Sequence, residues 1–117
     1  MRFLCLVYFD PDALAALSPR EKANLGRDAK ACDRQLERSG HLIVAQALRP
    51  ASDARTVRVR RGKASTTDGP FAETKEVLGG FVLVETADMK EAVEIAARLP
   101  MAKLGCIEVR PVRQTKA

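Results

Sequence analysis

The chain has 117 residues, of which 46% are hydrophobic and 30% are charged, and its formal net charge is +5. This length suits one domain, since domains most often contain about 100–150 residues, and the composition indicates a globular protein and excludes a disordered one. Because no run of residues approaches the ~18 apolar residues of a membrane-spanning helix, we predict a single domain over residues 1–117 that does not engage a membrane.

The first third of the chain predicts a strand followed by a long helix. Residues 3–9 are apolar at every position, which is typical of a strand buried on both faces, and the sequence "DPD" at residues 10–12 ends it. A helix begins after Ser18, because Pro19 suits the first helical position and Glu21 completes a capping box. Four apolar residues at helical spacing form the inner stripe of this helix: Leu25, Ala29, Cys32 and Leu36.

The middle of the chain predicts three further strands. Gly40 supplies the left-handed residue that ends the helix, and residues 41–48 form the next strand. Residues 55–61 alternate valine with arginine, and Gly62-Lys63 makes a hairpin turn into a short strand at residues 64–67.

The last third of the chain predicts a strand, a second helix and a final strand. Residues 80–87 form the strand, Asp88 and Glu91 repeat the capping pattern, and Pro100 ends the helix. The inner face of this helix consists of Ala92, Ile95, Ala96 and Leu99. Residues 105–112 alternate as the last strand.

This order of elements predicts an α+β, ferredoxin-like fold, in which an antiparallel sheet carries two helices on one face. The other face of the sheet is left uncovered. Residues 3–9 are apolar on both sides, and Phe81 and Leu83 alternate with Val82 and Val84, so the open face is not simply solvated. A second copy that packs sheet to sheet would cover it, and we therefore predict a homodimer.

Strand alternation also predicts a cluster of charges. If Val57 and Val59 face the helices, four charged residues face the open side of the sheet: Arg58, Arg60, Glu108 and Arg110. Unpaired charges enclosed in a dimer are costly. The cluster is therefore either a structural ion-pair network or a cleft that binds a small carboxylate, which arginine recognises with two hydrogen bonds.

The segment "TTDGPFAETKEVLGGF", residues 66–81, contains the second candidate site. Asp68 begins a turn with Gly69-Pro70, and Phe71 is expected to plug into the core. One short helical turn would bring Lys75 together with Glu73 and Glu76. Two interpretations stay open: a loop that sets strand register, or a ligand-binding loop in which Asp68 acts as a general base and Glu73 contacts the ligand.

Composition narrows the remaining chemistry. The three cysteines form no C-x-x-C pair, which favours reduced thiols and a cytoplasmic protein. The chain has one histidine, His41, and we expect no metal site and no cofactor. Cys106 would share a face with Arg110, and the charge of Arg110 would lower the pKa of the Cys106 thiol. The default interpretation of Cys106 is a small buried residue. The basic residues concentrate at 54–63 and 110–116, and with few aromatic residues nucleic-acid binding is not expected.

The segments "DGPFAETKE" (68–76), "LGGF" (78–81) and "EVRPV" (108–112) resemble the DGPF proteins, a branch of the YCII-related family. Other segments extend the resemblance over essentially the whole chain, among them "LSPREKA", "ALRP", "TVRVRRGK" and "EAVEIAARLP". The resemblance implies a ferredoxin-like, dimeric α/β barrel. It also implies that the gene lies near a gene for an extracytoplasmic-function sigma factor.

Wider YCII relatives include a dehydrochlorinase-type enzyme with a His-Asp pair. The histidine has no counterpart here, because the first helix offers Asn24 and Asp28 and His41 lies beyond it. DGPF proteins also often carry Glu in place of Gln46 and His in place of Leu104.

Two hypotheses follow: a small dimer whose cleft binds an acidic molecule, with lyase-like activity through Asp68, or a non-catalytic ligand- or protein-binding module linked to regulation by a sigma factor.

Overall fold

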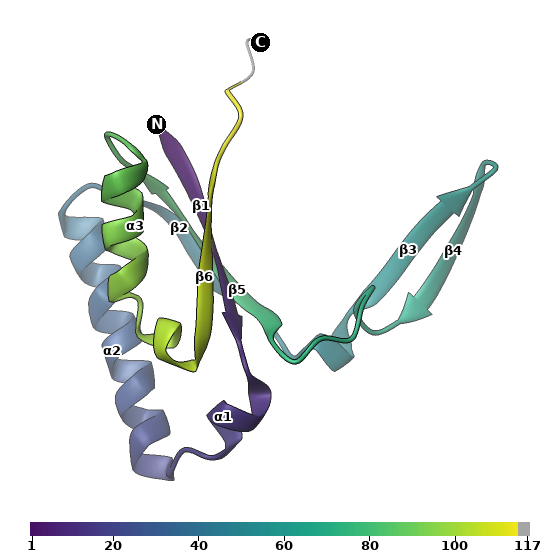
Figure 1. Ribbon diagram of the computed structural model, residues 1–117, viewed down its shortest axis with the longest axis horizontal. Coiled ribbons are helices and arrows are strands. Elements are labelled where there is room, and N and C mark those ends of the chain that lie inside the picture. The colour runs from purple at the N-terminus through teal and green to yellow at the C-terminus, as the bar shows by residue number, and fades with distance from the viewer. Residues whose placement is uncertain (115–117) are drawn as a thin grey trace.

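A computed structural model describes residues 1–114, which form a four-stranded antiparallel sheet, helices on one of its faces, and a separate two-stranded arm (Figure 1). The strand order in the sheet is β2-β5-β1-β6. These strands are β1 (Arg2–Phe9), β2 (Leu42–Ala47), β5 (Val77–Glu85) and β6 (Gly105–Pro111). The arrangement confirms the predicted α+β, ferredoxin-like fold. The last residues of the predicted basic tail, 115–117, lie outside the described part of the chain.

Both long helices begin at the predicted caps. The helix α2 spans Pro19–Arg38 and α3 spans Met89–Arg98. In the capping box of α2, the Ser18 hydroxyl accepts from the Glu21 backbone N–H at 3.1 Å, and the Glu21 carboxylate accepts from the Ser18 N–H at 2.9 Å. Asp88 caps α3 by accepting from the Glu91 N–H at 2.9 Å. These caps satisfy backbone donors that the first helical turn leaves without partners.

Short helical segments complete the domain: α1 (Pro11–Ala15) and two 3-10 segments, η1 (Ala51–Asp53) and η2 (Pro100–Leu104). The segment that starts at Asp10 was expected only to end the first strand. Instead, the Asp10 carboxylate accepts from the Asp12 N–H at 2.9 Å, and Pro11 occupies the first turn of α1. An aspartate followed by proline is a helix start as well as a strand end.

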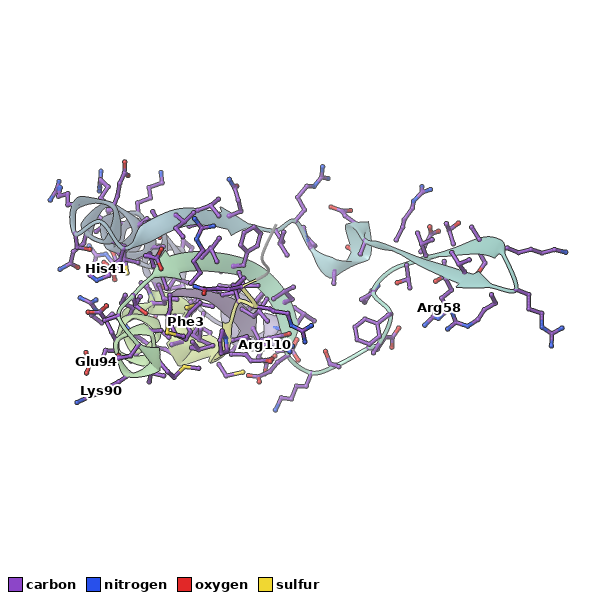
Figure 2. The ribbon with its side chains drawn as sticks, turned by 90° about the horizontal axis from the view of Figure 1, so that it is seen from above. Phe3, His41, Arg58, Lys90, Glu94 and Arg110 are labelled. Atoms are coloured by element: carbon purple, nitrogen blue, oxygen red, sulfur yellow. The ribbon has the colours of Figure 1, made fainter. Side chains whose placement is uncertain are left out.

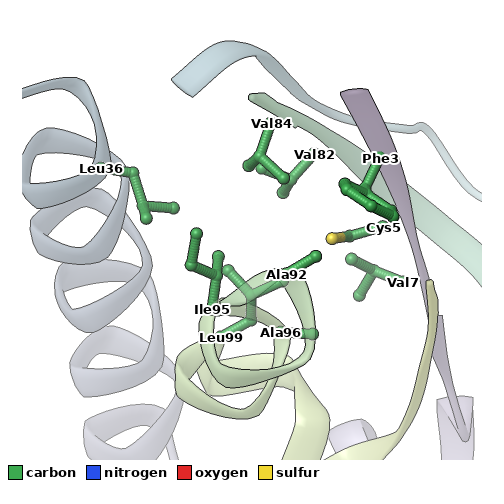
Figure 3. Packing of buried hydrophobic residues seen from close by; sticks show 10 residues of the cluster. All are labelled: Phe3, Cys5, Val7, Leu36, Val82, Val84, Ala92, Ile95, Ala96 and Leu99. Carbon is green, nitrogen blue, oxygen red and sulfur yellow. The ribbon is translucent and has the colours of Figure 1, made fainter. Parts of the chain in front are cut away.

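The core lies between the sheet and the two long helices (Figure 3). It is formed by alternate residues of β1 and β5, by one residue of α2 and by the inner face of α3: Phe3, Cys5, Val7, Val82, Val84, Leu36, Ala92, Ile95, Ala96 and Leu99. The predicted inner face of α3 is therefore confirmed. Of the predicted stripe on α2, only Leu36 is buried, at 2% exposure, while Leu25, Ala29 and Cys32 are half-buried.

The arm consists of β3 (Arg55–Arg60) and β4 (Lys63–Asp68), which pair only with each other and point away from the sheet (Figure 1). Arg61 and Gly62 form its turn, both with positive φ, one residue earlier than expected. The prediction that residues 55–61 belong to the main sheet is wrong. The arm explains a radius of gyration of 16.2 Å, against about 13 Å for a compact domain of this length.

The arm is inserted between two strands that are neighbours in the sheet, β2 and β5. The Leu48 N–H donates to the Gly79 carbonyl at 2.8 Å and so joins the two ends of this insertion. Closer to the arm, the Gly69 N–H donates to the Ala54 carbonyl at 2.7 Å, and the Thr56 hydroxyl donates to the Gly69 carbonyl at 2.9 Å. These bonds fix the base of the arm.

Candidate functional site

The largest cavity, about 850 Å³, lies where the base of the arm meets the end of the sheet. Its walls come from the end of β1, the segment that enters the arm, and the segment that returns from it. Apolar side chains form much of the lining, including Tyr8, Leu48, Phe71 and Leu78. A cleft of this size, with apolar walls and a few polar groups, is typical of small-molecule sites. We call it the arm-base cleft.

Two arginines contribute positive charge to the arm-base cleft. The Arg49 Nε lies 3.0 Å from the Asp53 carboxylate, and the Arg55 Nε lies 3.7 Å from the Asp68 carboxylate. Both arginine side chains are largely exposed, at 87% and 77%. Because a guanidinium carries five N–H donors, one such pair leaves donors for a bound anion.

A carboxylate and a thiol meet beside the cleft. Glu76 lines the cleft, and the Cys106 Sγ lies 3.7 Å from its Oε1. The pKa of Cys106 is raised, first by loss of solvation and then by the negative charges of Glu76 and Glu108. The expectation that Arg110 would lower the pKa of Cys106 is therefore wrong, because the charges that act on the thiol are those of the two carboxylates. The default expectation that Cys106 is buried is also wrong, since its side chain is exposed at the edge of the sheet. At neutral pH the side chain is a thiol, which is a poor nucleophile.

The structure separates the residues that were predicted to share one face. Arg58 and Arg60 lie on the exposed arm, whereas Glu108 and Arg110 lie on the sheet, where they pair at 3.8 Å (Figure 2). The physical reason is that β3 pairs with β4 alone, so its alternation does not place arginines on the sheet. Val57 and Val59 do not face the helices, since they are 61% and 58% exposed.

The opening motif is also placed differently from expectation. Phe71 is 80% exposed, so it is not a plug in the core. Asp68 is 92% exposed, pairs with Arg55, and does not line the arm-base cleft. Glu73 is exposed in the connection between β4 and β5, where no helical turn forms to bring it beside Lys75.

The cleft residues Tyr8, Arg49, Arg55 and Glu76 were not among the predicted ligand contacts. In the sequence, Arg49 directly follows the predicted strand 41–48, and Arg55 lies in the basic run 54–63. Their position in the sequence was the available signal. Arg49 and Arg55 lie at the two ends of the connection between β2 and β3, and binding residues are often found on such connections. Tyr8 had a second signal, since it is the polar-tipped residue of an otherwise apolar strand.

The open face of the sheet is apolar, as predicted. Gln46 of β2, opposite Phe81, is a polar residue on this face. Paired positions in β1, β5 and β2 also place one row of apolar side chains there: Leu4, Leu6, Tyr8, Phe81, Leu83 and Val44. They are half-buried, and the helices lie on the opposite side (Figure 1). Cys106, Glu108 and Arg110 form the edge of this face on β6, as their pairing with β1 requires.

His41 lies away from the arm, near the N-terminal end of α3 (Figure 2). Its Nδ1 is 2.7 Å from the Ser39 hydroxyl, and its Nε2 is 3.4 Å from the Glu91 carboxylate. His41 is thus held between Ser39 and Glu91 and does not line the arm-base cleft. Within residues 1–114, no group of three or more His, Cys, Asp or Glu side chains is placed to hold a metal ion. The helices in the same range are too short or too polar to cross a membrane.

A smaller cavity of about 160 Å³ lies between α2 and the ends of β2 and β5. Its polar lining includes Asp33 and Gln46, among mostly apolar neighbours such as Val82 and Met101. Burial raises the pKa of Asp33. No hydrogen bond or ion pair joins the Asp33 side chain to another residue within 1–114, so its charged form is only partly compensated.

The fold and the cleft define a small ferredoxin-like protein with an inserted β-arm. The chain belongs to the YCII-related family, because residues 1–116 match the YCII-related domain. An uncharacterized protein of Rhizobium meliloti is 38% identical over 114 residues, which are 96% of this chain and 92% of that protein.

Among solved structures, one similar fold is that of the 5-chloro-2-hydroxyhydroquinone dehydrochlorinase from Burkholderia phenoliruptrix, in complex with 2,5-dihydroxybenzoquinone. The TM-score is 0.56 at 16% sequence identity, and the match covers 98% of this chain and 96% of that one. This likeness supports the fold.

Proposed function

We propose that the protein is a homodimeric binding protein whose arm-base cleft holds a small, planar, anionic molecule. One observation carries the proposal: the cleft combines the aromatic side chains of Tyr8 and Phe71 with the exposed guanidinium groups of Arg49 and Arg55. Aromatic rings favour a flat apolar ligand, and a guanidinium favours a carboxylate or an ionised hydroxyl group.

The dehydrochlorinase of similar fold is in complex with a small ring that carries oxygen substituents. Such a ring meets both requirements of the arm-base cleft, and its volume is well below the 850 Å³ of the cavity. The ligand class that we propose is therefore hydroxylated quinones, phenols and aromatic carboxylates.

The charges favour binding over catalysis. A catalytic carboxylate would be expected inside the cleft and held by surrounding groups, with a pKa suited to proton transfer. Asp68 is instead outside the cleft and exposed, with the Arg55 Nε 3.7 Å from its carboxylate. Glu76 is inside the cleft, but its carboxylate lies 3.7 Å from the Cys106 thiol. We infer that the binding module is the better supported of the two hypotheses.

The open face of the sheet supports the proposal of a second copy. Its central row of leucine, valine and phenylalanine side chains, flanked by polar residues on β2 and β6, is the kind of apolar patch that a partner covers. Two such faces packed around a twofold axis would form an isologous interface. The expected mass in light scattering at micromolar concentration is therefore twice 12.8 kDa.

The ligand proposal is tested by calorimetric titration with 2,5-dihydroxybenzoquinone and with benzoate. Arg49→Ala and Arg55→Ala should each weaken binding by about tenfold or more, since a hydrogen bond to a charged group contributes about 1.5–3 kcal/mol. The matched control is Arg27→Ala, because Arg27 is exposed on α2 and does not line the cleft. Equal losses in all three variants, or no binding by the wild type, would refute the site.

A second measurement separates binding from catalysis. The protein is incubated with 5-chloro-2-hydroxyhydroquinone, and released chloride is compared with a protein-free sample. The binding proposal expects no acceleration, whereas chloride release that depends on protein concentration would establish lyase-like activity.

A further inference from the structure

The β3–β4 arm has two chemically different faces. Cross-strand pairs place Arg55, Val57 and Val59 of β3 on one face, opposite Asp68, Thr66 and Ala64 of β4. The other face carries Arg58 and Arg60, opposite Ser65 and Lys63. The tip half of the arm therefore has an apolar face, formed by Val57, Val59 and Ala64, and a cationic face, formed by Arg58, Arg60 and Lys63.

The apolar face of the arm has no partner within the described chain. Val57 and Val59 are 61% and 58% exposed, and Ala64 is also exposed. A two-stranded hairpin alone is only marginally stable in water, and this arm is bonded to the domain only at its base. Its valines and its two free edges require another surface if the arm is to hold one position.

The accessible surface area of the chain indicates how much surface a partner could cover. It is 8689 Å², whereas a compact monomer of this mass exposes about 6,300 Å². If each of two chains buried this excess of about 2,400 Å², the interface would bury about 4,800 Å² in total, which lies in the upper part of the range of obligate dimers. Much of the excess lies on the arm, which is exposed at nearly every residue, and on the unpaired sheet face.

We propose that the arm clasps a second copy of the chain, with the apolar face of Val57, Val59 and Ala64 against that copy and the cationic face toward solvent. This proposal rests on the homodimer of the proposed function, and assigns to the arm the part of the interface that the sheet face leaves open. Because Pro70 and Phe71 link the arm to the cleft wall, docking of the arm also fixes one wall of the arm-base cleft.

The second copy fits the arm better than a nucleic acid does. A β-ribbon that binds DNA needs its cationic face against phosphates, and that use would leave Val57 and Val59 in water. A protein surface would bury the two valines, which is favourable. It would leave the arginines in water, so that their charges are not desolvated.

The test compares the two faces of one strand with the same introduced residue. One variant carries Val57→Asn and Val59→Asn, and its matched control carries Arg58→Asn and Arg60→Asn. The dissociation constant of the dimer is measured by sedimentation, and exchange of arm amide hydrogens is measured in parallel. Four valines would leave the interface of each dimer, so the valine variant should raise the dissociation constant by about a hundredfold or more. Its arm amides should also exchange faster. The control should change neither quantity.

The outcomes separate the two proposals. A wild type that is monomeric at micromolar concentration overturns both the dimer and the clasp. A stable wild-type dimer that is unaffected by the valine variant overturns the clasp and leaves the sheet-face dimer intact. If the arginine variant weakens the dimer as much as the valine variant, the apolar face is not the docking surface. Loss of duplex DNA binding in the arginine variant alone, with fast exchange of arm amides in the wild type, would assign the arm to nucleic acid.

Discussion

Phe71 provides a direct test of how the "DGPF" segment contributes to the molecule, because the sequence suggested a core plug and the structure places the ring in the cleft wall. The perturbation is Phe71→Ala, and the matched variant is Phe3→Ala. The two residues are identical, yet Phe71 is 80% exposed and Phe3 is 1% exposed.

The expected magnitudes follow from these exposures. A phenylalanine side chain presents about 200 Å², so one fifth of the Phe71 surface is about 40 Å², which contributes about 1 kcal/mol to the free energy of unfolding at 25 cal/mol per Å². Phe3→Ala removes a fully buried ring and should cost about 3–5 kcal/mol. Phe71→Ala should instead weaken ligand binding in the arm-base cleft, by up to about tenfold.

The assay is urea denaturation followed by circular dichroism, at two protein concentrations so that dimer dissociation is seen separately from unfolding. Calorimetric titration of each folded variant with 2,5-dihydroxybenzoquinone completes the comparison. A loss for Phe71→Ala as large as that for Phe3→Ala, at every protein concentration, would refute the exposed position of Phe71 and restore the core-plug interpretation.

Two further predictions concern ionisable groups. Burial raises the pKa of Asp33, so stability falls as pH rises from the pKa of Asp33 in the unfolded chain to its higher pKa in the folded protein, and the loss is complete above the latter. Asp33→Asn should therefore melt at a higher temperature than the wild type at pH 7. That difference should vanish in acid, below the pKa of Asp33 in the unfolded chain, and a constant difference across pH would contradict the argument. The matched variant on the same helix is Asp28→Asn, since Asp28 is exposed. Glu76 raises the pKa of Cys106, so Glu76→Gln should lower that pKa and speed alkylation of Cys106 by iodoacetamide at pH 8, as followed by mass spectrometry. Glu73→Gln is the control in the same connection, and equal rates in all three proteins would show that Glu76 does not act on the thiol.

Local signals in the sequence predicted the elements well because their causes are local. The capping box at Ser18 and the cap at Asp88 depend on residues three positions apart, and both caps form as expected. The apolar periodicity of α3 likewise predicted its buried face. The antiparallel sheet with two helices on one face followed from the number and sequence of the elements, since few topologies accommodate them.

The candidate site was less predictable because it depends on where elements lie, not on what they are. Alternation in "RTVRVR" defines two faces of a strand and does not say which surface either face meets. Residues 55–60 form the expected strand, yet β3 pairs only in the arm. Phe71 shows the same limit: hydrophobicity predicts that an aromatic ring seeks cover, and a ligand or a second copy can supply that cover as well as a core.

The bond between Leu48 and Gly79 has a consequence for how this protein can vary. It closes the neck of an excursion in which residues 49–76 lie outside the four-stranded sheet, while Val77 and Leu78 still pair with β1. The strands β2 and β5 would therefore remain adjacent partners if residues 49–76 were replaced by a tight turn. The arm and the cleft wall are thus an appendage that insertions, deletions or exchange between relatives can remodel without shifting the pairing of any core strand. Specificity for a ligand and for a partner can change in this appendage, while the ferredoxin-like scaffold stays the same.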